Sequence, residues 1–203
     1  QGFAGGSGSN TLAGPNMNNT WNITSNNAGG INGIYTFSSF QNLSGGSLND
    51  RFLFSDGVGI TGTITGNGGT NWLDYSSYTA AVSVDFTSQT ATGTGGITDI
   101  NKVTGSGLAA DLLTGPNSDN VWQMTGQDEG NINGVITFID FANIHGSSQE
   151  DRFVFTDLGI GVNNVSGDVH GQGDADTLDY SNVNQEITVN LNNNTASLVG
   201  GNV

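Results

Sequence analysis

The chain contains two copies of one unit. The block GPNMNNTWNITSNNAGGINGIYTFSSFQNLSGGSLNDRFLF begins at Gly14 and returns as GPNSDNVWQMTGQDEGNINGVITFIDFANIHGSSQEDRFVF at Gly115, an offset of 101 residues without a gap. Further on, WLDYS at 72–76 matches TLDYS at 177–181 at an offset of 105, so the second copy has gained four residues. We place this insertion in a loop around VNNVSGDVHG. We therefore divide the chain into residues 1–101 and 102–203, two repeat copies with no linker.

A shorter pattern recurs inside each copy, in which an Asn or Asp closes a polar turn and an alternating strand follows. Its eight instances begin at Asn10, Asn19, Asp50, Asn71, Asp111, Asn120, Asp151 and Asp176. The second and fourth positions after the start of each instance are mostly apolar, whereas the third is mostly polar, as in a strand with one buried face. The side chains expected to point inward include Trp21, Ile23, Phe52, Phe54, Leu73, Tyr75, Trp122, Met124, Phe153, Phe155, Leu178 and Tyr180.

These repeated strands and polar corners predict an all-β fold, a parallel β-solenoid whose coils lie about 4.8 Å apart. Equivalent inward residues would then stack, so that Phe is expected beside Phe and Trp. The alternative is a pair of tandem β-sandwich domains of about 100 residues each. Sandwiches would explain the long period, but they would leave the shorter pattern unexplained.

The composition agrees with strands and turns and limits the partners. Gly occupies 33 positions, and 18 acidic against 3 basic residues give a formal net charge of −15. This charge would repel a phosphate backbone or an anionic lipid surface, so we expect neither a nucleic-acid partner nor membrane insertion. The chain has no cysteine, which excludes disulfides and thiolate metal sites and suits an exported bacterial protein. We expect an extracellular or cell-surface location.

Two of the three basic residues occupy equivalent places in the repeat. Arg51 lies in NDRFLF and Arg152 lies in EDRFVF. We expect each arginine to point outward, where it could neutralise an acidic column formed by Asp50, Asn71 and their neighbours. The alternative, which we favour, is an exposed ion pair of little energetic value. Because an exposed ion pair contributes about 0–1 kcal/mol, we expect the substitution Arg51→Gln to change stability little.

The segments GNGGTNWLDYS and GQGDADTLDYS resemble degenerate forms of the RTX nonapeptide GGxGxDxUx. The whole unit resembles repeats of very large bacterial extracellular proteins of the adhesin-like and filamentous-haemagglutinin-like kind. This resemblance implies an extracellular β-solenoid stalk or fibre segment with Ca²⁺ bound at its turns. At the fourth and sixth motif positions the second copy has Asp174 and Asp176, where the first has Gly69 and Asn71. Asp174 and Asp176 are therefore candidate Ca²⁺ ligands, and a solvated acidic turn is the alternative.

The sequence assembles no recognisable catalytic site. His145 and His170 have no Cys or His partner at ligand spacing, and neither a G-x-S-x-G nor a phosphate-binding motif occurs. We therefore expect a non-enzymatic structural segment of a bacterial extracellular fibre, adhesin stalk or surface layer. Its expected partners are neighbouring copies of the same repeat, stacked head to tail. The alternative is a surface module that binds calcium, carbohydrate or a cell surface, with Trp72 as a residue on which a sugar could stack.

Overall fold

The computed structural model describes all residues, 1–203, as strands and turns without a helix. The chain therefore contains no helix that could cross a membrane. It divides into two compact units, Gln1–Val82 with Gln89–Ser106 and Ser83–Ser88 with Gly107–Val203. Each unit is described separately below.

The first unit consists of two sheets, ordered β1-β5-β4-β3-β7-β9-β13 and β12-β8-β6-β2. Its strands are β1 (Gly2–Ala4), β2 (Thr11–Ala13), β3 (Asn19–Ser25), β4 (Ala28–Ile31), β5 (Tyr35–Ser38), β6 (Asn42–Gly46), β7 (Asp50–Phe54), β8 (Ile60–Asn67), β9 (Trp72–Asp74), β11 (Thr90–Ala91), β12 (Thr94–Thr98) and β13 (Lys102–Thr104). Strands β3, β7, β9 and β13 pair in parallel, one per coil. Strands β2, β6, β8 and β12 do the same in the other sheet.

The second unit repeats this arrangement, with sheets ordered β17-β16-β15-β19-β21 and β10-β14-β18-β20 and a small β22-β23 pair. Its strands are β10 (Ser83–Asp85), β14 (Leu112–Thr114), β15 (Asn120–Gly126), β16 (Glu129–Ile132), β17 (Ile136–Ile139), β18 (Asn143–Ser147), β19 (Asp151–Val154), β20 (Val169–Gln172), β21 (Thr177–Asp179), β22 (Val189–Asn190) and β23 (Thr195–Ala196). Strands β15, β19 and β21 are parallel, as are β10, β14, β18 and β20.

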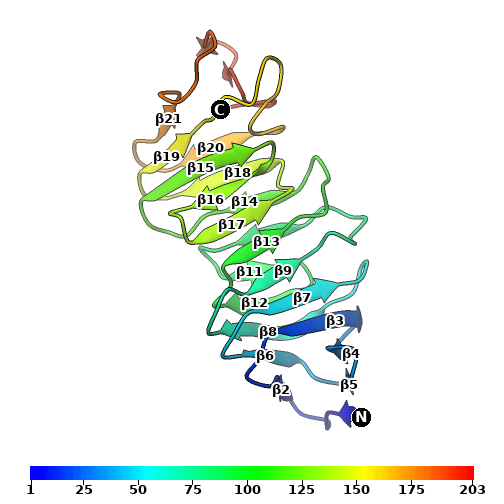
Figure 1. Ribbon diagram of the computed structural model, residues 1–203. Coiled ribbons are helices and arrows are strands. Elements are labelled where there is room, and N and C mark those ends of the chain that lie inside the picture. Colours follow the sequence, from blue (N-terminus) through cyan, green and yellow to red (C-terminus); the bar gives the residue numbers. More distant parts are fainter. The chain divides into compact units, whose positions relative to one another are not determined.

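The predicted parallel β-solenoid is therefore confirmed. Within each unit the successive strands of one sheet lie beside one another in coil order, such as β7, β9 and β13 or β15, β19 and β21 (Figure 1). The alternative of two β-sandwiches was wrong, because sandwiches are built from antiparallel sheets. Each instance of the Asn/Asp pattern begins one of these parallel strands, or immediately precedes it.

One part of each copy departs from parallel pairing. Strands β3, β4 and β5 form an antiparallel meander, and β15, β16 and β17 form its equivalent. The hairpin turn between β4 and β5 contains Asn32 and Gly33, whose φ angles are 55° and 66°. The second copy has Asn133 and Gly134 at 55° and 67°. Two successive positive φ angles favour an Asn-Gly pair, and such turns match the twist of a hairpin.

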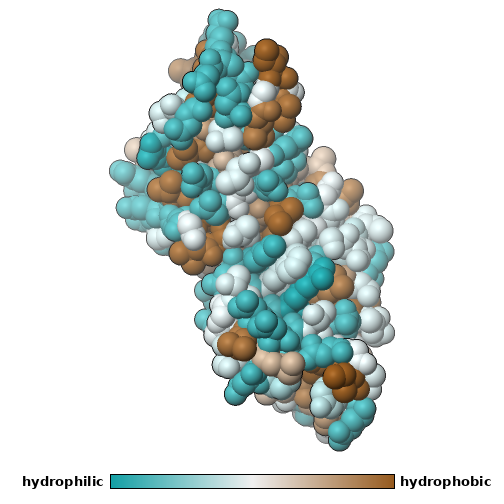
Figure 2. Space-filling model, in the orientation of Figure 1, coloured by the Kyte–Doolittle hydropathy of each residue, from teal (hydrophilic) through white to brown (hydrophobic).

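Most of the side chains that the alternation pointed inward are buried in the core, whereas Leu178 and Tyr180 are only partly buried. Trp21, Phe52 and Phe54 are completely buried. The predicted stacking between coils is confirmed, because the ring centroids of Trp21 and Phe52 lie 5.6 Å apart and those of Phe54 and Tyr75 lie 4.6 Å apart. The second copy repeats these stacks with Trp122–Phe153 at 5.6 Å and Phe155–Tyr180 at 4.7 Å. The visible outer surface is mostly hydrophilic or neutral, with hydrophobic residues in small separate groups (Figure 2).

Backbone hydrogen bonds locate the four extra residues of the second copy. The N–H of Ile60 donates to the carbonyl of Gly93 at 2.8 Å, and the N–H of Val165 donates to the carbonyl of Leu198 at 3.2 Å. This pair already follows the offset of 105, whereas Asp157 still matches its counterpart at an offset of 101. The insertion therefore lies within 158–164, so it overlaps only the beginning of the predicted segment.

Candidate functional site

Asn and Asp side chains, all of them buried except the exposed Asp176, connect one coil to the next at the corner before the parallel strands. The N–H of Asn19 donates to Oδ1 of Asp50 at 3.1 Å, and the N–H of Asp50 donates to Oδ1 of Asn71 at 3.0 Å. In the second unit the N–H of Asp151 donates to Oδ1 of Asp176 at 2.9 Å. We call this series the corner ladder; it comprises Asn19, Asp50 and Asn71 in one unit and Asn120, Asp151 and Asp176 in the other.

The polar groups around Asn19 and Asp50 explain the choice between Asn and Asp at these two corners. The amide Nδ2 of Asn19 donates to the carbonyls of Pro15 and Met17, both at 2.9 Å. The carboxylate of Asp50 instead accepts the N–H of Gly46 at 2.6 Å. In the second copy Asn120 and Asp151 make the equivalent bonds. A corner with inward carbonyls requires a donor, and one with an inward N–H requires an acceptor.

Glycine five residues before the Asn or Asp makes room for that side chain. The pairs are Gly5–Asn10, Gly14–Asn19, Gly45–Asp50, Gly66–Asn71, Gly115–Asn120, Gly146–Asp151 and Gly171–Asp176. A Cβ atom at any of these glycines would lie within 4 Å of its partner's side chain. Asp111, with Ser106 at that place, is the exception. Our sequence analysis missed this spacing of five residues, although the sequence alone contains it. The spacing accounts for part of the glycine content.

Substitution of one of these glycines tests the steric requirement. We expect Gly45→Ala to lower the free energy of unfolding by about 1–3 kcal/mol, because its Cβ would overlap the Asp50 carboxylate inside a packed corner. Gly8→Ala is the control, since a Cβ at Gly8 meets nothing within 4 Å. Urea denaturation of both variants measures the difference. Equal, small losses would show that the corner has spare room.

The predicted Ca²⁺ ligands occupy different positions. Asp174 is exposed in a turn with a φ angle of 64°, whereas Asp176 is the last member of the corner ladder and accepts the N–H of Asp151. As the side chains lie, no three histidine, cysteine or acidic side chains converge on one point where they could hold a metal ion. Calcium takes six to eight oxygen ligands, so further oxygen atoms would have to join these two carboxylates. Calcium binding therefore stays a prediction, and we assign Asp176 a structural role in the ladder.

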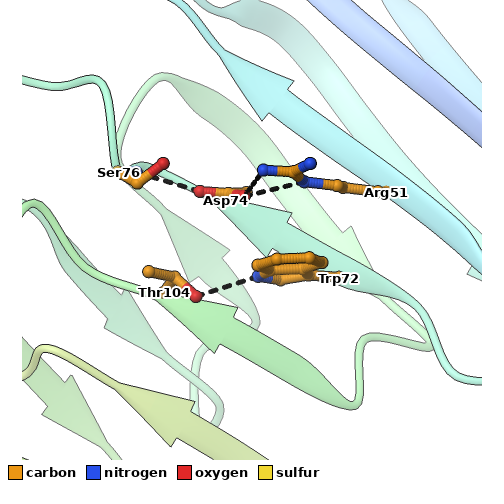
Figure 3. Close-up of polar contacts among 5 residues, drawn as sticks. All are labelled: Arg51, Trp72, Asp74, Ser76 and Thr104. Atoms are coloured by element: carbon orange, nitrogen blue, oxygen red, sulfur yellow. Dashed lines mark hydrogen bonds and ion pairs between the residues drawn. The ribbon is translucent and has the colours of Figure 1, made fainter.

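Arg51 pairs with a buried carboxylate on the next coil. Its Nε donates to Oδ2 of Asp74 at 2.8 Å, and its Nη2 forms an ion pair with the same oxygen (Figure 3). The Asp74 side chain is only 1% exposed, and its Oδ1 accepts the N–H of Ser76 at 3.0 Å. The expected acidic partner of Arg51 near Asp50 was wrong. Arg51 pairs with Asp74, because the Asp50 carboxylate lies inside the corner ladder.

The two equivalent arginines allow a matched test of this ion pair. Arg152 pairs with Asp179, whose side chain is 10% exposed. We expect Arg51→Gln to lower the free energy of unfolding by about 1–3 kcal/mol, since it leaves a buried carboxylate without its counter-charge. Arg152→Gln should cause a loss below about 1 kcal/mol, as for an exposed pair. The loss expected for Arg51→Gln is therefore larger than the small change that we expected from the sequence. Equal losses in urea denaturation would contradict this difference.

The outward ring of Trp72 is covered by cationic side chains. The Arg51 guanidinium carbon lies 4.3 Å and the Lys102 ammonium 4.1 Å from the ring centroid. These residues pair with Trp72 from the strands on either side of β9, so each covers one face of the ring. The indole Nε1 donates to Oγ1 of Thr104 at 3.0 Å (Figure 3). A sugar could stack on Trp72 only by displacing one cation, so the ring contributes contacts between coils instead.

A histidine pair that the sequence analysis did not connect lies on the outside of the second unit. His145 on β18 and His170 on β20 are direct partners in the parallel register. Their ring centroids lie 5.0 Å apart with an interplanar angle of 76°. Oδ2 of Asp168 lies 4.0 Å from Nε2 of His170. The two histidines are 25 residues apart in sequence, a distance set by the length of a coil and not by a local motif.

The fold and these contacts define a β-solenoid repeat protein. Comparison of the chain with protein-family models, with curated proteins and with solved structures gave no match. A fold of this kind does not by itself imply an activity. The function is therefore inferred from the contacts between coils and from the strands at the edges of the sheets.

Proposed function

We propose that the chain is a non-enzymatic structural segment of a bacterial extracellular fibre, adhesin stalk or surface layer. Its coils would continue onto neighbouring copies of the same repeat, head to tail. The proposal is supported by the contacts that the characteristic side chains of the repeat make. The corner ladder, the stacked aromatic rings and the Arg51–Asp74 pair all connect one coil to the next. Such contacts provide cohesion along a solenoid and need no ligand.

The observation that carries the proposal is the pairing of β13 with β9. Strand β9 is the last patterned strand of the first copy, and β13 is the strand with which the second copy begins. They are parallel, with Lys102 opposite Trp72 and Thr104 opposite Asp74. The chain therefore already contains one junction between the end of one repeat copy and the start of the next.

The repeat offsets define the equivalent junction between two chains. Strand β21 corresponds to β9 at an offset of 105, and Gly2 in β1 corresponds to Val103 in β13 at an offset of 101. Both β1 and β21 are edge strands of their sheets. Transfer of the β9–β13 register places Gly2 of a following copy opposite Leu178. Unpaired strand edges readily accept a further strand, and here the following copy would supply it.

A tandem fusion tests this junction. Val203 corresponds to Thr98 and Gln1 to Lys102, so the linker between two complete chains would be Asp-Ile-Asn, copied from 99–101. In the existing junction Oδ1 of Asn101 accepts the N–H of Asn71 at 3.2 Å. In the fusion, the side chain of the copied Asn would accept the N–H of Asp176 in the same way. We expect the fusion to unfold at a higher urea concentration than the single chain, because each added interface stabilises a solenoid.

A proline in β1 provides the control. The N–H of Gly5 donates to Ser38, and the carbonyl of Gln1 accepts from Thr36, so both groups face β5. Because N–H groups alternate between neighbours, that of Ala4 faces the free edge. Ala4→Pro in the second chain of the fusion therefore blocks the junction without removing a bond within the chain. We expect this variant to unfold like the single chain. A fusion that unfolds at the single-chain urea concentration would overturn the proposal.

A further inference from the structure

We propose that His145 and His170 bind a divalent transition-metal ion on the outer face of the second unit, with Asp168 as a third ligand. The ion would be one that favours imidazole nitrogen, such as Zn²⁺, Ni²⁺ or Cu²⁺. This site is separate from the predicted Ca²⁺ ligands Asp174 and Asp176. It does not depend on the proposed stacking of copies.

The sheet holds the two imidazoles at a distance that one ion can bridge. His145 and His170 lie opposite each other on adjacent parallel strands, and their ring centroids are 5.0 Å apart. Zinc–nitrogen bonds measure about 2.0–2.1 Å, so an ion between two such rings can reach a nitrogen of each. The side chains do not converge on one point as they lie. Binding therefore requires the rings to turn from their edge-to-face arrangement, and water would complete the coordination.

The third ligand is held in place beside the pair. Asp168 precedes His170 by two residues, and its Oδ2 lies 4.0 Å from Nε2 of that ring. Its Oδ1 accepts the N–H of Asn202 at 2.6 Å, which fixes the carboxylate and leaves Oδ2 directed toward the histidine. A carboxylate anchored by a second hydrogen bond is a common feature of metal sites.

The formal net charge of −15 also attracts cations to the chain.

The first copy provides a natural reference without ligands. His145, His170 and Asp168 correspond to Ser44, Thr65 and Thr63. Ser44 and Thr65 form the same register pair between β6 and β8. The fold thus accepts small hydroxyl side chains at these places. His145→Ser and His170→Thr can therefore remove the ligands while the coil is retained.

Titration with ZnCl₂ by calorimetry at neutral pH tests the site. We expect one ion per chain, a loss of affinity of at least about tenfold for Asp168→Asn, and a larger loss for each histidine variant. The double variant His145→Ser/His170→Thr should bind no ion at this site, while its circular dichroism and metal-free thermal midpoint match those of the unsubstituted chain. Electron paramagnetic resonance of the Cu²⁺ complex should show two coordinated imidazole nitrogens. Equal Zn²⁺ affinity in the double variant, or no binding by the unsubstituted chain below millimolar Zn²⁺, would overturn the proposal.

Discussion

Replacement of Asp50 by alanine should lower the free energy of unfolding by about 2–4 kcal/mol, because the corner would lose a buried charged acceptor. The Asp50 carboxylate accepts the N–H and the Nδ2 of Asn19 at 3.1 and 2.6 Å, and the N–H of Gly46 at 2.6 Å. The N–H of Gly46 would stay buried without this acceptor, at about 1–3 kcal/mol. The N–H of Asn19 also donates to the carbonyl of Asn49, and its Nδ2 also donates to the carbonyls of Pro15 and Met17, so these two donors would lose only their bond to the carboxylate. Urea denaturation followed by circular dichroism measures this loss.

Asp176→Ala is the matched control, because Asp176 belongs to the corner ladder of the second unit and immediately precedes the edge strand β21. It is exposed, and its carboxylate accepts the N–H of Asp151. We expect a loss of about 1 kcal/mol or less, since water can replace this acceptor. Asp50→Asn adds a second comparison, because an amide group would direct a donor at the N–H of Gly46 in one orientation. Equal losses for Asp50→Ala and Asp176→Ala would show that the ladder does not stabilise the coils.

Replacement of Trp21 by alanine should lower the free energy of unfolding by about 3–5 kcal/mol, as for a large side chain removed from a packed core. Trp21 is completely buried, and its ring stacks on Phe52 at 5.6 Å and meets Phe37 edge-on at 6.0 Å. The cavity would interrupt the aromatic stack between two coils. Thermal and urea denaturation together would establish the loss.

Trp72→Ala removes the same type of side chain from the outer face of the same sheet. It eliminates the hydrogen bond to Thr104 and the contacts with Arg51 and Lys102. These contacts are partly solvated, so we expect a loss of about 1–2 kcal/mol. A loss for Trp72→Ala as large as that for Trp21→Ala would contradict the assignment of inward and outward faces.

The strands and their buried faces were predictable because side chains alternate with a period of two along any strand. Trp21, Phe52 and Leu73 follow this alternation and are completely buried. The stacking of aromatic rings was predictable as well, because the repeat gives equivalent residues to successive coils. Neither inference requires the exact number of residues in a coil.

The partners of outward side chains were not predictable in the same way. Arg51 and Asp74 are 23 residues apart, and their meeting depends on the register between β7 and β9. His145 and His170 are likewise brought together by the register between β18 and β20. Register depends on the lengths and shapes of the intervening corners, which the alternation leaves open. The antiparallel meanders were missed for a different reason, because the Asn-Gly turns that mark them were not interpreted as hairpins.

The central claim, that the ends of the repeat pair with neighbouring copies, is tested most directly by negative-stain electron microscopy of the purified chain. The chain would be imaged over a range of concentrations, with calcium and with a chelator, beside the Ala4→Pro variant. We predict fibres of uniform width for the unsubstituted chain in both conditions and short single particles for the variant. Short single particles of the unsubstituted chain at every concentration would contradict end-to-end pairing.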